Sequence, residues 1–321
     1  MSFTFDLPMS RQTTSHIFMV RPTHFGFNHE TASNNAFQVN DQRPLDEIRN
    51  LAVLEFDKLV KALRNSSVHV TVYQEDIHSK LTDSIFPNNW FSTHEDGSIV
   101  TYPMYSRSRR EERKEDVIEL LSSRFIINNY IHLEGYENQD KFLEGTGSIV
   151  LDRKNQKAYA CRSIRTDEEI LNRFCAEFEL EKILFDATDH SCQPIYHTNV
   201  MMSIGEELAI ICCDSIKNKD QREIVLREFQ NDGKEIIDIS LEQMKNFSGN
   251  VLQVKSINGE HLMVMSSRAF ASFSSEQIHQ IKKHCQIVHS PIPIIEQYGG
   301  GGVRCMIAEI FLPLKEPSHD L

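Results

Sequence analysis

Residues 148–186, SIVLDRKNQKAYACRSIRTDEEILNRFCAEFELEKILFD, contain one complete strand–strand–helix–strand unit. Short runs rich in apolar residues predict strands at Ser148–Asp152, Lys157–Cys161 and Lys182–Asp186. Asp167–Phe178 has the helical spacing of apolar residues, and Thr166 with Glu169 has the spacing of a capping box. The stretch therefore predicts a ββαβ module.

The same plan extends over the whole chain. Four further amphipathic helices are predicted at Pro44–Arg64, Glu111–Ile127, Lys219–Gln230 and Ser274–Lys283, the last with a capping box of Ser274 and Gln277. Further strands are predicted at Val68–Tyr73, Ser98–Tyr102, Val200–Ser203, Leu208–Cys213, Glu235–Ile239, Val251–Lys255, His261–Met265, Gln286–His289 and Arg304–Phe311. Five such units favour a closed array in which each unit covers its neighbour's apolar face. An ordinary two-layer α/β domain is the alternative, and in either case we expect one domain over residues 1–321.

Composition narrows the classes of function. The 321 residues include 34 Lys and Arg against 46 Asp and Glu, so the net charge is −12. An acidic chain without a basic tract is a poor candidate for binding nucleic acid or an anionic membrane. No secretory signal is recognised in residues 1–12 and no transmembrane run is present. Seven cysteines without a CxxC pair indicate free thiols in a reducing cytoplasm, with no metal site and no cofactor expected.

Residues 299–306, GGGGVRCM, are the strongest local signal for a reactive site. Four glycines in a row allow positive φ and close approach of the backbone to another group. Cys305 follows at the expected start of a strand, where a ligand could reach its thiol. A flexible turn and a buried structural cysteine are the alternative interpretation.

Four other segments carry residues that could act with such a thiol. Glu144 lies in FLEGTGS (142–148), and His197 with Asn199 lies in HTN, where both could face one side of an extended segment. FPNNWFSTH (86–94) mixes aromatic side chains with amides, as a pocket wall or a core corner would. Arg107 and Arg109 belong to the basic run YSRSRR (105–110), which is either a solvated helix start or a clamp for a carboxylate. A cysteine, a histidine and a glutamate together supply a nucleophile, an acid–base group and an orienting carboxylate.

In combination these motifs resemble the guanidino-group-modifying superfamily, which includes arginine deiminases, dimethylarginine hydrolases and amidinotransferases. PNNWF, LEGTG, HTN and GGGGVRCM are similar to the family's pocket, EGG, His-x-Asp and catalytic cysteine motifs, and they extend over most of the chain. The resemblance implies the pentein fold, a five-bladed α/β-propeller of ββαβ modules around a central channel.

The resemblance also implies roles for individual residues. Cys305 would be the nucleophile, His197 the general acid and base, and Glu144 the group that orients His197 or holds a substrate N–H. The substrate-binding residues would be Asn88 at the amino-acid end, Phe91 against the planar head group, and Arg109, Arg107 and Arg165 for the α-carboxylate.

Two departures from the family pattern bear on the substrate. Deiminases hold the guanidinium with two aspartates, and alignment through the motifs places His94 and Asn199 at those positions. A buried guanidinium without counter-charges would cost several kcal/mol, whereas His94 and Asn199 could donate hydrogen bonds to the oxygen of a neutral ureido group. The segment PNNWFSTH also resembles the citrulline hydrolase branch of the superfamily.

The sequence therefore predicts a cysteine-dependent hydrolase that converts citrulline to ornithine, carbon dioxide and ammonia. Action on a guanidino substrate is the alternative within the class, and a non-catalytic pentein that only binds ligand is the alternative outside it. We expect a small amino acid as the partner, neither nucleic acid nor membrane, and a homodimer as in related enzymes. Because a ureido substrate carries no charge, we expect protonated His94 and His197 to lower the pKa of Cys305.

Overall fold

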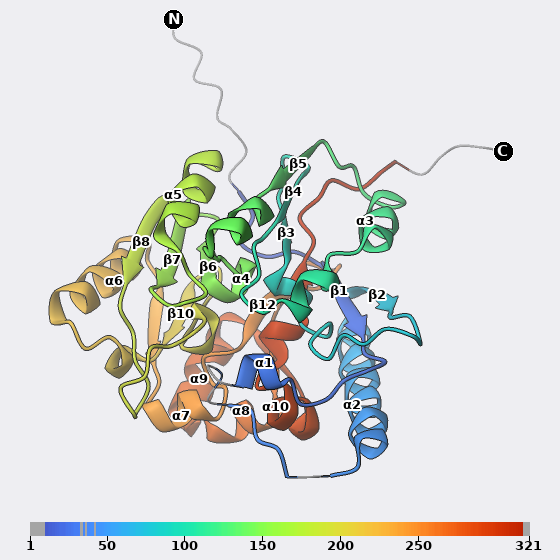
Figure 1. The fold of residues 1–321 in the computed structure, drawn as a ribbon. Coiled ribbons are helices and arrows are strands. Elements are labelled where there is room, and N and C mark those ends of the chain that lie inside the picture. Colours follow the sequence, from blue (N-terminus) through green and yellow to red (C-terminus); the bar gives the residue numbers. More distant parts are fainter. Residues whose placement is uncertain (1–9, 33–34, 36, 42, 317–321) are drawn as a thin grey trace, which may run out of the picture.

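Five three-stranded sheets dominate the computed structural model, which describes residues 10–32, 35, 37–41 and 43–316 (Figure 1). In every sheet the central strand pairs antiparallel with one neighbour and parallel with the other. A parallel pair needs a crossover connection, and in each module a helix supplies it. Residues 1–9, which make up most of the segment assessed for a secretory signal, lie outside the described residues.

The strands are β1 (His16–Arg21), β2 (His69–Gln74), β3 (Phe91–Thr93), β4 (Ser98–Thr101), β5 (Asn129–His132), β6 (Ile149–Asp152), β7 (Lys157–Cys161), β8 (Glu181–Phe185), β9 (Met202–Ile204), β10 (Leu208–Ile211), β11 (Glu235–Asp238), β12 (Leu252–Lys255), β13 (His261–Ser266), β14 (Gln286–Ser290) and β15 (Ala308–Glu309). Their orders within the sheets are β15-β1-β2, β3-β4-β5, β6-β7-β8, β9-β10-β11 and β12-β13-β14. Near the end of the chain β15 pairs with β1, with Ile17 opposite Glu309, so the last strand completes the first sheet. The expected closed array of five modules, the pentein fold, is thereby confirmed.

The crossover helices are α2 (Leu45–Asn65), α3 (Glu115–Ser122), α5 (Glu168–Glu177), α6 (Lys219–Asn231) and α9 (Ser275–His284). Figure 1 shows α2, α3, α5 and α6 around the outside of the molecule. The shorter helices are α1 (His29–Ala32), α4 (Gly145–Ser148), α7 (Leu241–Lys245), α8 (Ser267–Ser272) and α10 (Pro293–Gly299). All five predicted crossover helices are therefore confirmed in place.

Two predicted helix starts are corrected by the structure. The side chain that caps α5 is that of Asp167, which accepts hydrogen bonds from the backbone N–H groups of Glu169 and Ile170, and not that of Thr166. The third helix begins at Glu115 because the preceding residues Ser108–Glu112 form the 3-10 turn η2. The capping box of Ser274 and Gln277 is confirmed.

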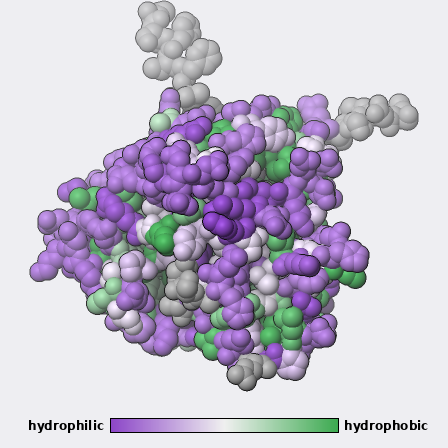
Figure 2. Space-filling model, viewed as in Figure 1, coloured by the Kyte–Doolittle hydropathy of each residue, from purple (hydrophilic) through white to green (hydrophobic). Residues whose placement is uncertain are grey.

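The apolar faces of the helices supply the core between helices and sheets. The helix α2 buries Phe56, Leu59 and Leu63 in one cluster with Ile17 and Met19 of β1. The outer surface is different, since Figure 2 shows mainly hydrophilic residues on this face with apolar ones in small groups. Among the described residues, no helix has the length and apolar character needed to cross a membrane.

The strand predicted at Arg304–Phe311 is mostly wrong, and the error concerns the site. Val303–Met306 form the 3-10 turn η6, and only Ala308–Glu309 pair as a strand. Three strands were not predicted: β1, β3 and β5.

The first strands of the modules surround the axis of the molecule. β15 contacts β3, β6 contacts β9, and β9 contacts β12. The residues just before these strands share one end of the array, and the hairpin turns that follow them share the other end.

Candidate active site

Cys305 lies in η6, directly after the glycine run and before β15. Gly300 adopts a positive φ of 65°, and a Cβ at Gly301 would lie 2.8 Å from the Phe86 ring, so these two glycines are required by geometry. They let the chain turn tightly beneath Phe86 and bring the thiol to the wall of a cavity.

The Cys305 thiol is buried, with an exposed fraction of 5%, and two side-chain amides surround it. Asn250 Nδ2 donates to Sγ at 3.2 Å, and Asn199 Nδ2 lies 3.8 Å from the same atom. Burial raises the pKa of Cys305 above its ordinary value, and the hydrogen bond from Asn250 only partly opposes this. The expectation of a lowered pKa is therefore wrong for this conformation, and the thiol needs a base to ionise it.

His197 and Glu144 form a hydrogen-bonded pair, with Arg165 as a third member. His197 Nε2 donates to Glu144 Oε2 at 2.7 Å, and Arg165 Nη1 donates to the same oxygen at 3.2 Å. The other oxygen, Oε1, accepts the backbone N–H of Tyr105 at 2.9 Å. Burial by itself would raise the pKa of Glu144, but Arg165 and His197 outweigh it, and the net effect is a strongly lowered pKa.

These contacts assign the tautomer of His197. Glu144 is ionised and can only accept, so Nε2 of His197 carries the hydrogen and Nδ1 keeps its lone pair. Burial lowers the pKa of His197 to about 4, although the hydrogen bond to Glu144 opposes this effect. His197 is therefore neutral near pH 7 and can accept a proton at Nδ1. A Cβ at Gly147 would lie 2.9 Å from that nitrogen, so the glycine of LEGTG leaves room beside it.

Each of the five modules brings residues to this end of the array. Asn89 belongs to the 3-10 turn η1 (Pro87–Asn89) before β3, and Glu144 precedes α4 and β6. His197 precedes the turn η4 (Thr198–Val200) and β9, Asn250 precedes β12, and Cys305 precedes β15. The site is thus built from residues far apart in sequence, as a central site in a closed array requires.

A narrow cavity joins these groups. It is lined by Thr31, Asn35, Asp83, Phe86, Asn89, Arg109, Arg165, Tyr196, His197, Gly299, Gly300, Gly301 and Cys305. Its volume is about 20 Å³, enough for about one water molecule. An amino-acid substrate therefore needs parts of the wall to move aside. Within the described residues, no group of three or more His, Cys, Asp or Glu side chains could hold a metal ion.

Arg109 and Arg165 both line the cavity, and both already bind carboxylates of the protein. Arg109 donates Nε and Nη2 to the two oxygens of Glu112, each at 2.9 Å, and Nη1 to Asn89 Oδ1 at 2.9 Å. Arg107 is exposed at the start of η2 and does not line the cavity. The structure thus brings two of the three candidate arginines to the site.

In and beside the PNNWF motif, the side chains that line the cavity are not the expected ones, Asn88 and Phe91. Phe91 packs in the core against Phe18, with ring centroids 5.6 Å apart, and Asn88 is buried behind the wall, where its Nδ2 contacts Thr146. Phe86 and Asn89 line the cavity in their place. The reason is the 3-10 turn η1, whose rotation decides which side chains face the cavity.

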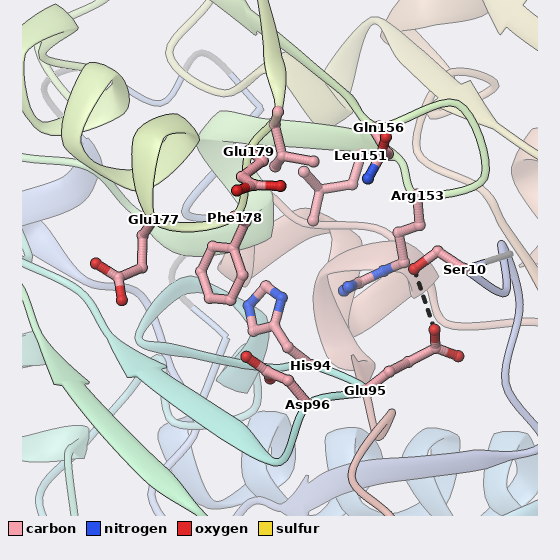
Figure 3. A pocket seen from close by; sticks show the side chains of 11 residues that line it. Ser10, His94, Glu95, Asp96, Leu151, Arg153, Gln156, Glu177, Phe178 and Glu179 are labelled. Atoms are coloured by element: carbon pink, nitrogen blue, oxygen red, sulfur yellow. Dashed lines mark hydrogen bonds between the residues drawn. The ribbon is translucent and has the colours of Figure 1, made fainter. Parts of the chain in front are cut away.

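His94 lies outside the cavity that Cys305 lines. The strand β3 runs away from Asn89 at about 3.3 Å per residue, so His94 comes out at the hairpin end. There its ring stacks on Phe178 at a centroid distance of 3.8 Å, in a different cavity (Figure 3). The predicted contact of His94 with the substrate oxygen is therefore not seen, whereas Asn199 lies beside the thiol.

Several residues of the site were not predicted from the sequence, among them Asp83, Tyr196 and Asn250. Asp83 and Tyr196 line the cavity, and Asn250 binds the thiol. A signal existed for Asn250, because it stands immediately before the predicted strand Val251–Lys255, at the place where the other modules carry their site residues. Asp83 lies four residues before Pro87, outside the motif that was recognised.

Solved structures with the same fold include an arginine dihydrolase and a dimethylarginine dimethylaminohydrolase. The N-terminal domain of ArgZ, an arginine dihydrolase of cyanobacteria, matches with a TM-score of 0.71 and 14% identity, over 92% of this chain and 99% of that one. Complete ArgZ matches with a TM-score of 0.72 and 15% identity, over 94% of this chain and 41% of its own length. A dimethylarginine dimethylaminohydrolase, solved as an adduct with S-methyl-L-thiocitrulline, matches with a TM-score of 0.64 and 15% identity. The match covers 92% of this chain and 99% of that one. Identities this low establish the fold alone.

The family itself follows from the sequence. No curated protein matches the chain significantly. The family model of N,N dimethylarginine dimethylhydrolase, eukaryotic, matches residues 21–312, which is most of the chain. The chain therefore belongs to the N,N dimethylarginine dimethylhydrolase family and is a pentein hydrolase acting on C–N bonds.

Proposed function

We propose that the protein hydrolyses the ureido group of citrulline, with Cys305 as nucleophile, to give ornithine, carbon dioxide and ammonia. The observation that carries the proposal is the set of groups around the thiol. The side-chain groups that contact its sulfur by hydrogen bonds are the amides of Asn250 and Asn199. Both oxygens of the nearby Glu144 are engaged, by His197 and Arg165 on one side and by Tyr105 on the other.

A neutral head group fits these surroundings better than a cationic one. A buried guanidinium needs a carboxylate with free acceptor capacity, or it costs several kcal/mol. A ureido group has one oxygen that accepts and N–H groups that donate, and amide side chains can satisfy both. His94 does not line this cavity and does not contribute to the preference. The preference comes from Asn199, Asn250 and Asn89, and Nδ2 of Asn89 is buried without a hydrogen bond to a described residue.

The amino-acid end of the substrate would lie near Asp83. This carboxylate is buried, and its Oδ2 accepts from Asn28 Nδ2 at 2.8 Å, while Oδ1 has no partner among the described residues. Burial raises the pKa of Asp83, and Arg109, 4.0 Å away, opposes that rise. An α-ammonium group would satisfy the free oxygen, and Arg165 or Arg109 would receive the α-carboxylate.

The chemistry follows from the protonation states. His197 takes the thiol proton at Nδ1, and the thiolate of Cys305 attacks the ureido carbon. The amides of Asn199 and Asn250 stabilise the developing oxyanion. His197 then returns its proton to the departing amine of ornithine, which leaves an S-carbamoyl group on Cys305. A water activated by His197 hydrolyses that group to carbamic acid, which decomposes to carbon dioxide and ammonia.

A guanidino substrate is the second candidate, and one observation favours it. The unpartnered oxygen of Asp83 could pair with a guanidinium as well as with an α-ammonium. Arginine or a methylated arginine would then bind with its head group nearer to Asp83. This reading also agrees with the names of the family and of the structural neighbours.

A substrate panel separates the two candidates. Purified protein would be assayed with citrulline, arginine, agmatine, dimethylarginine and N-carbamoyl amino acids, and ornithine, citrulline and ammonia would be quantified. We expect the highest kcat/KM with citrulline and equal amounts of ornithine and ammonia. A higher kcat/KM with arginine or dimethylarginine would reject the proposal in favour of the second candidate, and no turnover of any substrate would favour a binding protein.

A further inference from the structure

We infer that the cavity at the hairpin end of the array is a second ligand site, which binds a free α-amino acid with its carboxylate on Arg153. The cavity lies between the β3–β4 turn, the β6–β7 turn and the connection from α5 to β8 (Figure 3). Cys305 and His197 precede the first strands of their modules, whereas these turns follow such strands. The two sites therefore lie at opposite ends of the array.

The size of the cavity suits a small molecule. Its volume is about 280 Å³. Since a water molecule occupies about 30 Å³ of liquid, there is room for about nine waters, or for an amino acid of similar size. The active-site cavity described above is far smaller in the same structure.

Arg153 lines this cavity with a guanidinium that no carboxylate of the described residues neutralises by an ion pair. Its guanidinium packs over the Phe311 ring at 3.9 Å and forms no ion pair within 4.0 Å to any described carboxylate. The nearby Glu309 is already bound by Arg304 at 3.0 Å. Figure 3 shows the guanidinium reaching into the cavity toward His94. A planar guanidinium with free donors is the protein group best matched to a carboxylate, which it can bind through two hydrogen bonds.

His94 supplies a second donor and a flat wall. Its exposed fraction is 6%, and its ring stacks on Phe178. Nε2 contacts Ser92 Oγ at 3.0 Å, and Ser92 Oγ contacts the Tyr102 hydroxyl at 2.6 Å. If Tyr102 donates to Ser92 and Ser92 donates to Nε2 of His94, both hydroxyl hydrogens in this series of hydrogen bonds are used. Nδ1 of His94 then carries a hydrogen, and no described residue accepts it.

Acidic residues at the rim complete the match to a zwitterion. Glu177 and Glu179 line the cavity and form no hydrogen bond or ion pair with a described residue. The other two rim carboxylates are engaged, since Asp96 accepts from Ser98 and Glu95 accepts from Ser10 and Arg11. A simple anion would be repelled by this rim and a simple cation by Arg153, whereas an α-amino acid places opposite charges against both.

Calorimetric titration of the full-length protein tests the site. The probes are L-alanine, L-leucine, L-glutamate and L-arginine, with acetate and the methyl ester of each binding amino acid for comparison. We expect at least one amino acid to bind, and both the ester and Arg153→Met to weaken it by at least about tenfold, which corresponds to about 1.4 kcal/mol. The double variant Glu177→Gln, Glu179→Gln should also weaken it, and because both side chains are exposed this variant should fold.

Three results would overturn the inference. They are the absence of binding by all four amino acids, binding that Arg153→Met leaves unchanged, and acetate binding as tightly as the amino acids. If Arg153→Met does not fold, Arg153→Lys replaces it, because it keeps the charge but loses the planar pair of donors. Unchanged binding by that variant, together with unchanged binding by the double glutamine variant, would count equally against the site.

Discussion

Glu144→Gln should abolish most turnover, because every group around this carboxylate is a donor. His197 Nε2 and Arg165 Nη1 point at one oxygen, and the backbone N–H of Tyr105 points at the other. A glutamine keeps the shape but replaces one oxygen by NH₂. Whichever way the amide is turned, an NH₂ group faces a donor, and His197 loses the partner that holds its hydrogen on Nε2.

The size of the effect follows from these contacts. The acid–base function of a positioned histidine is worth about 10²- to 10⁴-fold in rate, so we expect kcat to fall by that factor. A buried donor left unsatisfied beside a charged group costs about 1–3 kcal/mol, so the free energy of unfolding should also fall by about that amount. Steady-state ornithine production and chemical denaturation measure the two quantities.

Glu112→Gln is the matched control. Glu112 is also buried, and it accepts two hydrogen bonds from Arg109, so a glutamine creates the same mismatch beside an arginine. No hydrogen bond joins Glu112 to His197 in the structure. We expect a similar loss of stability but a much smaller loss of kcat. The reasoning is refuted if Glu144→Gln keeps kcat within about tenfold of the wild type, or if both variants lose kcat equally.

Three further predictions follow from the same site. Cys305→Ser should lose nearly all turnover, because an alcohol is far less ionised than a thiol, whereas Cys175→Ser should stay within a few fold; the opposite order would identify the wrong thiol. The rate of alkylation of Cys305 by iodoacetamide should continue to rise with pH above the ordinary thiol pKa, because burial raises the pKa of Cys305. The acid limb of kcat/KM should lie near pH 4, because His197 is a base only above its pKa of about 4. An acid limb near the ordinary histidine pKa would contradict this. Asp83→Asn should raise KM for citrulline about tenfold or more but leave KM for Nα-acetylcitrulline unchanged; equal effects on both would remove Asp83 from the α-ammonium site.

The repeating architecture could be predicted because most strands and helices of the modules have a recognisable local sequence pattern. The run Lys157–Cys161 is the strand β7 without a change of bounds, and Ser274 with Gln277 caps α9 as expected. Two of the three strands that were not predicted are short or polar, whereas β1 (His16–Arg21) carries the apolar run Ile17–Val20 that is typical of a buried strand. The strand β3 has three residues, and β5 (Asn129–His132) is largely exposed, so neither shows the apolar pattern that indicates a strand.

The errors in the site have one physical origin, which is the path of the backbone between motif residues. The sequence places His94 three residues after Phe91, but those residues form β3, whose length carries His94 to the other end of the array. The turn η1 likewise decides that Phe86 and Asn89 face the cavity, while Phe91 and Asn88 do not. Periodicity does not reveal the rotation of a short 3-10 turn, so these side chains required the structure.

The chemical identity of the group attached to Cys305 during turnover tests the central claim most directly. The protein would be mixed with citrulline, quenched in acid within the first turnovers, digested, and analysed by peptide mass spectrometry, with Cys305→Ser as the control. We predict that the wild-type peptide containing Cys305 gains the mass of a carbamoyl group while ornithine is released, and that the control gains nothing. Release of ornithine without any adduct on this peptide, or no reaction of citrulline at all, would contradict the account.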